Sequence, residues 1–268
     1  MSESNSFREF SPQKKLGQHF LKSQPVVHEI LKAADIQEID TILEVGPGPG
    51  ILTQGLLRSS AHKVIAVELD RQFWESLEKL ESQEEGRFVL VKGDAAKVSL
   101  GSLGGPLKIV ANLPYNVGTL LLLNWLKELN HVSKMVLMFQ KEVVDRICAD
   151  PHTKAYGRLS ILTQWKCQVK SIIDVPPASF YPAPKVDSAV VEIIPRDKPL
   201  FPVSEEALES LTRILFQSRR KMLRASLKPL KIDDLEGKLG ALNISPTARP
   251  EELTVEDFCK LALVVFPA

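Results

Sequence analysis

Apolar residues recur along the first two-thirds of the chain in two alternating patterns, short continuous runs and helical spacing. Near-continuous apolar runs are typical of parallel strands that are buried on both faces. Such runs predict strands at 41–46, 63–69, 88–91, 107–111, 134–139, 171–175 and 189–194. Helical spacing predicts helices at 51–59 and 71–83. Strands separated by helices indicate a doubly wound α/β sheet, to which 189–194 adds an antiparallel edge.

The pattern changes after Pro195-Arg-Asp-Lys-Pro199. From Ser204 onward only helical periodicity remains, and prolines and glycines interrupt it. We therefore predict two domains. Residues 1–198 form the α/β domain, which includes a basic N-terminal segment, and residues 199–268 form a small all-helical domain.

Composition narrows the setting of the protein. The chain has 268 residues, is 44% hydrophobic and carries 34 basic against 33 acidic residues, which is enough for a sizeable core. No apolar run reaches the length of a membrane span, and no signal-peptide segment is evident, so we expect a cytoplasmic protein with no membrane partner. The three cysteines are far apart and form no CxxC pair, which predicts reduced thiols and no metal site.

A glycine-rich loop, Glu44-Val-Gly46-Pro-Gly48-Pro-Gly50, follows the first predicted strand of the sheet and opens a helix. Glycines allow a tight turn and let a ligand approach the backbone, so Gly46 and Gly48 are candidate cofactor contacts. The loop ends Gly50-Ile-Leu rather than Gly-Lys-Ser/Thr, and its spacing is GxGxG rather than GxGxxG. It is therefore neither a P-loop nor a standard dinucleotide fingerprint, and an ordinary strand–helix turn is the alternative.

Two acids follow at the ends of the next two predicted strands. Glu68 comes about 20 residues after the glycines, where an acid can accept hydrogen bonds from ribose hydroxyls. Asp94, in Gly93-Asp94-Ala95, is suited to accept from an adenine amino group. Successive parallel strands place these residues and the loop along one crevice. Together they favour S-adenosylmethionine over NAD as the cofactor and indicate a Rossmann-like class I methyltransferase sheet with helices on both faces.

The tetrapeptide Asn112-Leu113-Pro114-Tyr115 ends the predicted strand 107–111 and indicates the chemistry. An adenine N6 amine is a poor nucleophile because its lone pair is delocalised into the ring. The Asn112 side-chain oxygen and the Leu113 carbonyl can hold its two N–H groups, so that the lone pair points at a sulfonium methyl group. Pro114 stiffens the turn and Tyr115 stacks on the base. The alternative is a simple strand-ending turn.

Two further regions suit nucleic-acid binding. Phe180 and Tyr181 precede a proline-rich loop, and either ring can stack on a base opposite Tyr115, or else form an aromatic wedge that packs the end of the sheet. A basic stretch in the helical region suits phosphate contact, although such stretches are often only solvated surface. Its candidate RNA-binding residues are Arg219, Arg220, Lys221 and Arg224, and Lys14, Lys15 and Lys22 are expected to extend that surface.

Motifs across nearly the whole chain resemble the bacterial 16S ribosomal RNA adenine N6,N6-dimethyltransferase family. They are Leu16-Gly-Gln-His-Phe-Leu21, Glu44-Val-Gly-Pro-Gly-Pro-Gly50, Val67-Glu-Leu-Asp70, Gly93-Asp-Ala95, Asn112-Leu-Pro-Tyr-Asn116, Gln140-Lys-Glu-Val-Val-Asp-Arg146, Tyr156-Gly-Arg-Leu159, Phe180-Tyr-Pro-Ala-Pro-Lys-Val-Asp-Ser188 and Phe216-Gln-Ser-Arg-Arg-Lys221. The resemblance implies that His19 and Leu21 contact the cofactor together with Gly46, Glu68, Asp94 and Asn112. Ala183 and Gly118 depart from the family pattern, where a proline and a small hydroxyl residue are common.

The resemblance also implies a substrate. It points to two adjacent adenosines near the 3′ end of 16S rRNA, each methylated twice, in an immature small ribosomal subunit, with a role in ribosome biogenesis. We expect the protein to act as a monomer and without a metal. Two alternatives stay open: a large-subunit rRNA adenine methyltransferase of the macrolide-resistance type, and a non-catalytic RNA-binding assembly factor. A DNA adenine methyltransferase is disfavoured because the chain has no large recognition domain.

Overall fold

The computed structural model describes residues 11–13 and 16–267. The chain forms two compact units, the first made of Met1–Val144 and Lys170–Pro195 and the second of Asp145–Val169 and Arg196–Ala268. The last change of unit falls between Pro195 and Arg196. Residues 145–169 also belong to the second unit, whereas the predicted division at 198 places them in the α/β domain.

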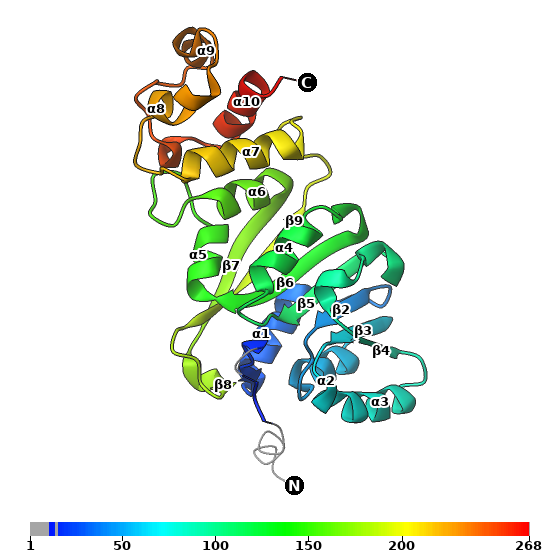
Figure 1. Cartoon of the computed structure of the whole chain (residues 1–268). Coiled ribbons are helices and arrows are strands. Elements are labelled where there is room, and N and C mark those ends of the chain that lie inside the picture. Colours follow the sequence, from blue (N-terminus) through cyan, green and yellow to red (C-terminus); the bar gives the residue numbers. More distant parts are fainter. Residues whose placement is uncertain (1–10, 14–15, 268) are drawn as a thin grey trace. The chain divides into compact units, whose positions relative to one another are not determined.

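A seven-stranded sheet in the order β4-β3-β2-β5-β6-β9-β7 confirms the predicted α/β architecture (Figure 1). Its strands are β2 (Thr41–Val45), β3 (Lys63–Glu68), β4 (Phe88–Lys92), β5 (Leu107–Asn112), β6 (Val132–Gln140), β7 (Cys167–Val175) and β9 (Ser188–Pro195). The five strands from β4 to β6 are parallel, and β9 runs antiparallel to β6.

The predicted antiparallel orientation of β9 is confirmed, but its predicted position at the sheet edge is wrong. β9 lies between β6 and β7, and β7 forms the edge. Burial gives the physical reason. Seven of the eight residues of β9 are apolar or small, and five residues of the strand are buried, which suits an interior strand. Exposed polar residues instead recur along β7. A polar, partly exposed strand is tolerated at an edge, where one side faces water.

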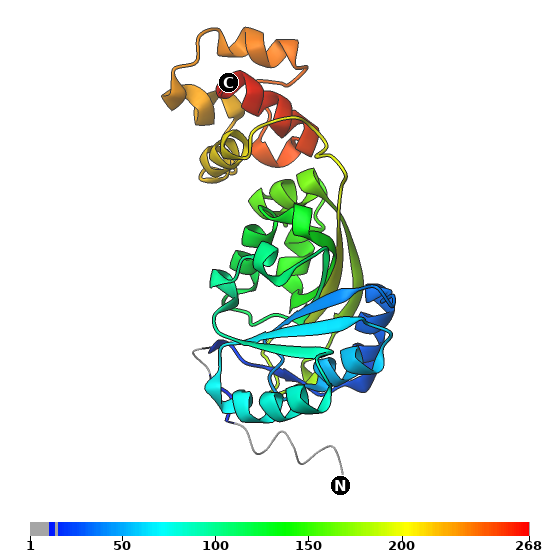
Figure 2. The same ribbon diagram turned by 90° about the vertical axis from the view of Figure 1, so that its right-hand side faces the viewer.

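Helices pack against the sheet on both faces. α1 (Gln24–Ala34), α2 (Ile51–Arg58) and α3 (Trp74–Gln83) share one hydrophobic cluster with alternate residues of the parallel strands, so they cover the same face. In Figure 2 these blue-to-cyan helices lie on one side of the strands, and the green helix α4 (Gly118–Trp125) lies on the other. The predicted helix 71–83 begins as a 3-10 turn, η3 (Arg71–Phe73), before α3.

A small second sheet brings the two ends of the α/β unit together. β1 (Phe20–Leu21) pairs antiparallel with β8 (Phe180–Tyr181), with Phe20 opposite Tyr181. The main sheet also reverses its winding direction between β2 and β5, since β3 and β4 lie on one side of this pair and β6 on the other. Ligands bind at such a switch point, at the carboxyl ends of the strands.

The second unit is helical, as predicted for the C-terminal part of the chain. It contains α6 (Arg158–Lys166), α7 (Glu205–Phe216), α8 (Leu223–Leu227), α9 (Leu235–Ala241) and α10 (Val255–Val265), and the chain enters it through α5 (Lys141–Ile147). α6 lies in the second unit, and its residues are buried on several sides rather than along one stripe. Its Trp165 indole donates to the Phe201 carbonyl at 2.9 Å, and its Lys166 pairs with Glu205 at 2.6 Å. A helix without an amphipathic pattern gave no sign in the sequence of which unit it joins.

Candidate functional site

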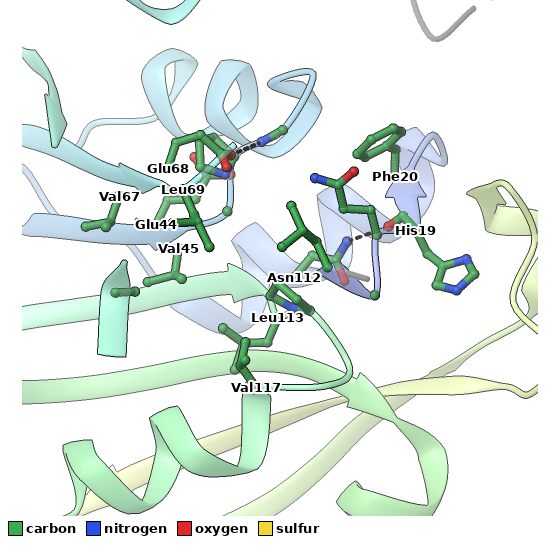
Figure 3. A pocket seen from close by; sticks show the side chains of 18 of the residues that line it. His19, Phe20, Glu44, Val45, Val67, Glu68, Leu69, Asn112, Leu113 and Val117 are labelled. Atoms are coloured by element: carbon green, nitrogen blue, oxygen red, sulfur yellow. Dashed lines mark hydrogen bonds between the residues drawn. The ribbon is translucent and has the colours of Figure 1, made fainter. Parts of the chain in front are cut away.

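A pocket opens at the carboxyl ends of β2, β3, β4 and β5, entirely within the α/β unit. Five separate segments of the chain line it: 16–21, 44–52, 67–69, 93–95 and 112–121 in part. Figure 3 shows Glu44 and Glu68 on one side of this pocket, and Asn112 with His19 on the other. The predicted cofactor residues and the Asn112–Tyr115 motif therefore lie in one pocket, as expected for residues at the carboxyl ends of neighbouring parallel strands. Every predicted cofactor residue lines the pocket: His19, Leu21, Gly46, Gly48, Glu68, Asp94 and Asn112.

The glycine-rich loop forms the floor of the pocket. Gly46 and Gly48 adopt φ values of 69° and 54°, in the left-handed region that side chains disfavour. The Gly46 amide donates to the Val67 carbonyl at 2.9 Å, which ties the loop to β3. A Cβ atom at position 48 would lie 3.4 Å from the Phe20 ring. The loop thus presents bare backbone at the start of α2, where unpaired N–H groups and the helix dipole favour a carboxylate.

Glu68 is held rigidly at the end of β3 and is only 4% exposed. Its Oε2 accepts from the Gly48 amide at 3.1 Å, and its Oε1 accepts from the Asp70 amide at 2.7 Å. Burial raises the pKa of Glu68, and the hydrogen bonds from the backbone amides of Asp70 and Gly48 oppose that rise. Each carboxylate oxygen has two lone pairs, so both keep acceptor capacity for a pair of hydroxyl groups.

Asp94 stands at the end of β4, where it caps the short 3-10 turn η4 (Ala95–Lys97). Its Oδ1 accepts from the Ala96 amide at 3.0 Å. This bond fixes the carboxylate at the pocket wall between Gly93 and Ala95, which also line the pocket. The half-exposed Leu69 lines it too, so an apolar surface and an acceptor are available together for a flat heterocycle.

Asn112 is oriented by a bond across the pocket. Its Nδ2 donates to the His19 carbonyl at 3.2 Å (Figure 3). Because the amide nitrogen is used there, the Oδ1 acceptor is the end of the side chain left to meet an amino group. The Leu113 amide donates to the Met138 carbonyl at 3.2 Å, which fixes the following residue against β6. The Pro114 carbonyl accepts from the amides of Val117 and Gly118, so the motif turns directly into α4.

Tyr115 and His19 form the aromatic side of the pocket. The two rings lie 5.2 Å apart at 30°. The Tyr115 hydroxyl is 2.6 Å from Ser188 Oγ, and burial raises the pKa of Tyr115, an effect that the Ser188 hydrogen bond opposes. His19 Nδ1 lies 2.7 Å from the Pro182 carbonyl and therefore carries a hydrogen, since a carbonyl oxygen only accepts.

The structure corrects the expectation for Phe180. This side chain is 1% exposed, packs in the hydrophobic core and is not among the residues that line the pocket. The aromatic-wedge alternative describes its position, because pairing of β8 with β1 turns alternate side chains to opposite faces and sends Phe180 inward. Its neighbour Tyr181 is 41% exposed.

Gly118 is explained by close packing. A Cβ atom there would lie 3.0 Å from two carbons of the Phe139 ring and 3.3 Å from Leu113 Cβ. A larger residue at this position requires Phe139 to move, so glycine lets the turn after the Asn112 motif pack closely against that ring.

Glu44 is a pocket residue to which the sequence analysis gave no role. It is fully buried beneath the glycine loop, and its Oε2 has no hydrogen-bond partner among the described residues. Burial raises the pKa of Glu44 to about 8, and the nearby Glu68 carboxylate adds to that rise. Its position directly before the glycines was the signal that could have identified it.

The predicted RNA-binding residues differ in their surroundings within the helical unit. Arg220, Lys221 and Arg224 are exposed. Arg219 is part-buried, and its guanidinium donates to Glu251 at 2.5 Å and to the carbonyls of Lys154 and Thr153 at 2.5 and 2.8 Å. Arg219 therefore fastens the 153–154 loop to the C-terminal helices. Lys14 and Lys15 lie outside the described residues.

No group of three or more His, Cys, Asp or Glu side chains in residues 11–13 and 16–267 is arranged to hold a metal ion. Over the same residues, no helix combines the length and apolar character that crossing a membrane requires.

Comparisons with known proteins point to one family. The family model for ribosomal RNA adenine dimethylase matches residues 9–265. "Ribosomal RNA small subunit methyltransferase A" of Rhodospirillum rubrum is 47% identical over 251 residues, which cover 93% of this chain and 86% of the relative. A solved dimethyladenosine transferase of Plasmodium falciparum superposes with a TM-score of 0.80 at 29% identity, covering 91% of this chain and 96% of that one. The 23S rRNA methyltransferase ErmE shares the fold, with a TM-score of 0.69 at 24% identity over 92% of this chain and 99% of its own.

The pocket fits S-adenosylmethionine by its own chemistry. The bare glycine backbone at a helix start suits a carboxylate, the Glu68 acceptors suit ribose hydroxyls, and Asp94 beside Leu69 suits an adenine. The matched family model extends over nearly the whole chain and includes every one of these residues. The chain therefore belongs to the ribosomal RNA adenine dimethylase family of S-adenosylmethionine-dependent methyltransferases.

Proposed function

We propose that this protein dimethylates N6 of two adjacent adenosines near the 3′ end of 16S rRNA in the immature small ribosomal subunit. It acts as a monomer in the cytoplasm during ribosome biogenesis. Relatives named as small-subunit methyltransferases, with 42–47% identity over more than nine-tenths of the chain, support this substrate. The 24% identity to a 23S rRNA methyltransferase favours it over the large-subunit alternative.

The orientation of Asn112 carries the proposal. Its Nδ2 is occupied by the His19 carbonyl at 3.2 Å, so its Oδ1 faces the pocket as an acceptor for one N–H of the adenine amine. The Leu113 carbonyl accepts the second N–H. Two acceptors on one amine draw its nitrogen toward tetrahedral geometry and restore the lone pair as a nucleophile. Positioning and electrostatics supply this activation, with no general base.

The remaining walls align the two reactants. When bound, S-adenosylmethionine supplies an electrophilic methyl group on its sulfonium. Glu68 would hold the ribose hydroxyls, Asp94 would hold the adenine amino group, and the glycines at 46 and 48 would leave room for the methionine end beside the start of α2. Tyr115 stacks on the target base, and its bond to Ser188 at 2.6 Å fixes the ring plane. The apolar lining excludes water that would compete for the methyl donor.

The helical unit contributes RNA contacts through Arg220, Lys221 and Arg224. Their side chains are exposed, which phosphate contact requires. Arg219 instead bonds the carbonyls of Thr153 and Lys154 and the Glu251 carboxylate, so its effect on RNA binding is indirect.

The second candidate function is that of a non-catalytic RNA-binding assembly factor. An intact acceptor at Asn112 and a complete cofactor wall favour the enzyme, because a binding factor has no need of either. Incubation with labelled S-adenosylmethionine and unmethylated small subunits, followed by mapping of the modified bases, distinguishes the candidate functions. We expect label on N6 of two adjacent adenosines of 16S rRNA. Label confined to 23S rRNA in a parallel incubation with unmethylated large subunits would support the large-subunit alternative, and no label in either subunit would support the assembly factor.

A further inference from the structure

We propose that Asp70 is a positioning residue that anchors the N-terminal segment to the cofactor pocket. By N-terminal segment we mean the described residues 11–13 and 16–19. Asp70 acts together with Glu68. Although Asp70 does not line the pocket, its side chain thereby influences the affinity for the cofactor. The inference concerns the cofactor half of the site and does not depend on which rRNA is methylated.

The Asp70 carboxylate collects four hydrogen bonds at one buried point and is 5% exposed. Its Oδ2 accepts from the side-chain amides of Gln13 at 2.9 Å, Gln18 at 2.7 Å and Gln72 at 2.5 Å. Its Oδ1 accepts from the Gln72 backbone amide at 3.1 Å. Two of these donors, Gln13 and Gln18, come from a segment more than 50 residues away in sequence.

Charge makes this anchor strong. Burial by itself raises the pKa of Asp70, but the amides of Gln18, Gln72 and Gln13 outweigh it and hold the pKa below its usual value. Hydrogen bonds to an ionised carboxylate are shorter and stronger than bonds between neutral groups. The carboxylate is therefore charged at neutral pH and binds the segment without any basic side chain from it.

The anchored segment is a wall of the pocket. The Gln18 side chain also accepts from the Gln13 amide at 2.8 Å, and the Leu16 amide donates to the Gln13 carbonyl at 3.0 Å, so the segment forms a compact turn. Residues 16–19 of this turn line the pocket. The turn ends at the His19 carbonyl, which orients Asn112.

The same residue links this wall to the opposite side. The Asp70 backbone amide donates to Glu68 Oε1 at 2.7 Å, and Glu68 Oε2 in turn holds the Gly48 amide. Residues 68–70 therefore include both Glu68, the proposed ribose ligand, and Asp70, which holds the N-terminal segment in place. A disturbance at the Asp70 side chain is expected to loosen the wall while the Glu68 contacts stay in place.

The variant Asp70→Asn tests the anchor. Asparagine keeps one acceptor oxygen but replaces the other with an N–H₂ group, so in either amide orientation a donor faces a donor. The N–H₂ group meets the three glutamine amides in one orientation and the Gln72 backbone amide in the other. The variant Gln13→Ala removes one anchoring bond without changing any residue that lines the pocket. Asp35→Asn removes a carboxylate charge from an exposed position of the same unit and serves as the control.

Titration calorimetry with S-adenosylhomocysteine and hydrogen exchange of the 16–21 amides are the measurements. We expect the dissociation constant to rise on the order of tenfold or more in Asp70→Asn and about threefold in Gln13→Ala, with Asp35→Asn unchanged. Exchange should quicken at 16–21 but not in β3 or β4, a local effect that general destabilisation does not produce.

Wild-type affinity in both Asp70→Asn and Gln13→Ala, or unchanged exchange at 16–21, would overturn the proposal. If Asp70→Asn does not fold, Gln13→Ala alone decides. A wild-type protein that fails to bind S-adenosylhomocysteine would instead refute the cofactor assignment, so the two failures are distinguishable.

Discussion

Replacement of Glu68 by glutamine should weaken cofactor binding with little change in the size of the side chain. The carboxylate is 4% exposed and accepts from two backbone amides, Gly48 at 3.1 Å and Asp70 at 2.7 Å. Glutamine has one acceptor oxygen, so at least one of these amides faces an N–H₂ group. The lost oxygen is also one of the two proposed acceptors for ribose hydroxyls.

The magnitude follows from the charge of the group. A hydrogen bond to a charged acceptor contributes about 1.5–3 kcal/mol, and an unsatisfied buried donor costs a similar amount. We therefore expect the affinity for S-adenosylhomocysteine to fall by roughly 10- to 100-fold. Titration calorimetry measures it, and Glu75→Gln, an exposed acid in the first turn of α3, is the matched control.

A dissociation constant for Glu68→Gln within about twofold of the wild type would refute this reasoning. It would mean either that the ribose is bound elsewhere or that the loop adjusts to the amide without loss. Unfolding of the variant would be visible as a lowered thermal midpoint, which has to be measured in the same preparation.

Three other predictions concern the core, the buried acid and the basic surface. Folded wild-type protein holds a proton on Glu44 (pKa about 8) that the unfolded chain releases near 4.5, so the unfolding free energy of the wild type should fall by about 3 kcal/mol between about pH 5 and pH 8. In Glu44→Gln this fall should largely disappear, which denaturant titrations of both proteins at the two pH values measure. Phe180→Ala should cost about 3–5 kcal/mol of unfolding free energy, and a near-neutral effect would return this ring to the pocket. Alanine at Arg220, Lys221 and Arg224 should lower the salt slope of subunit binding by about one per lost phosphate contact, and an unchanged slope would remove them from the interface.

Much of the α/β unit was predictable because buried parallel strands have an unmistakable pattern. All seven predicted strands exist, and their ends converge on the pocket that the glycines and acids indicated. The order of the last two strands was not predictable, since periodicity reports burial but not which strand is the neighbour. The apolar pattern of β9 is compatible with an edge strand or an interior strand. Its interior position follows only from its place between β6 and β7 in the folded sheet.

The errors at the site have the same origin. Phe180 was expected to face a base because it is aromatic and stands before a proline-rich loop, yet pairing of β8 with β1 turns it into the core. The three glutamines around Asp70 carry no charge, and the motif that contains Gln18 does not show where its side chain points, so nothing in the sequence joined residues 13 and 18 to residue 70. Side chains that act through long-range hydrogen bonds become visible only when the fold brings them together.

Single-turnover methyl transfer by Asn112→Ala tests the central assignment most directly. Unmethylated small subunits and labelled S-adenosylmethionine are the substrates, and S-adenosylhomocysteine affinity is measured alongside. The account predicts that transfer to adenine N6 falls by about 100-fold or more, because an acceptor for the reacting amine is removed. Cofactor affinity should fall far less, because only the Asn112 bond to the His19 carbonyl is lost from the pocket wall. Transfer at the wild-type rate with intact cofactor binding would contradict the role of Asn112 in holding the adenine amine.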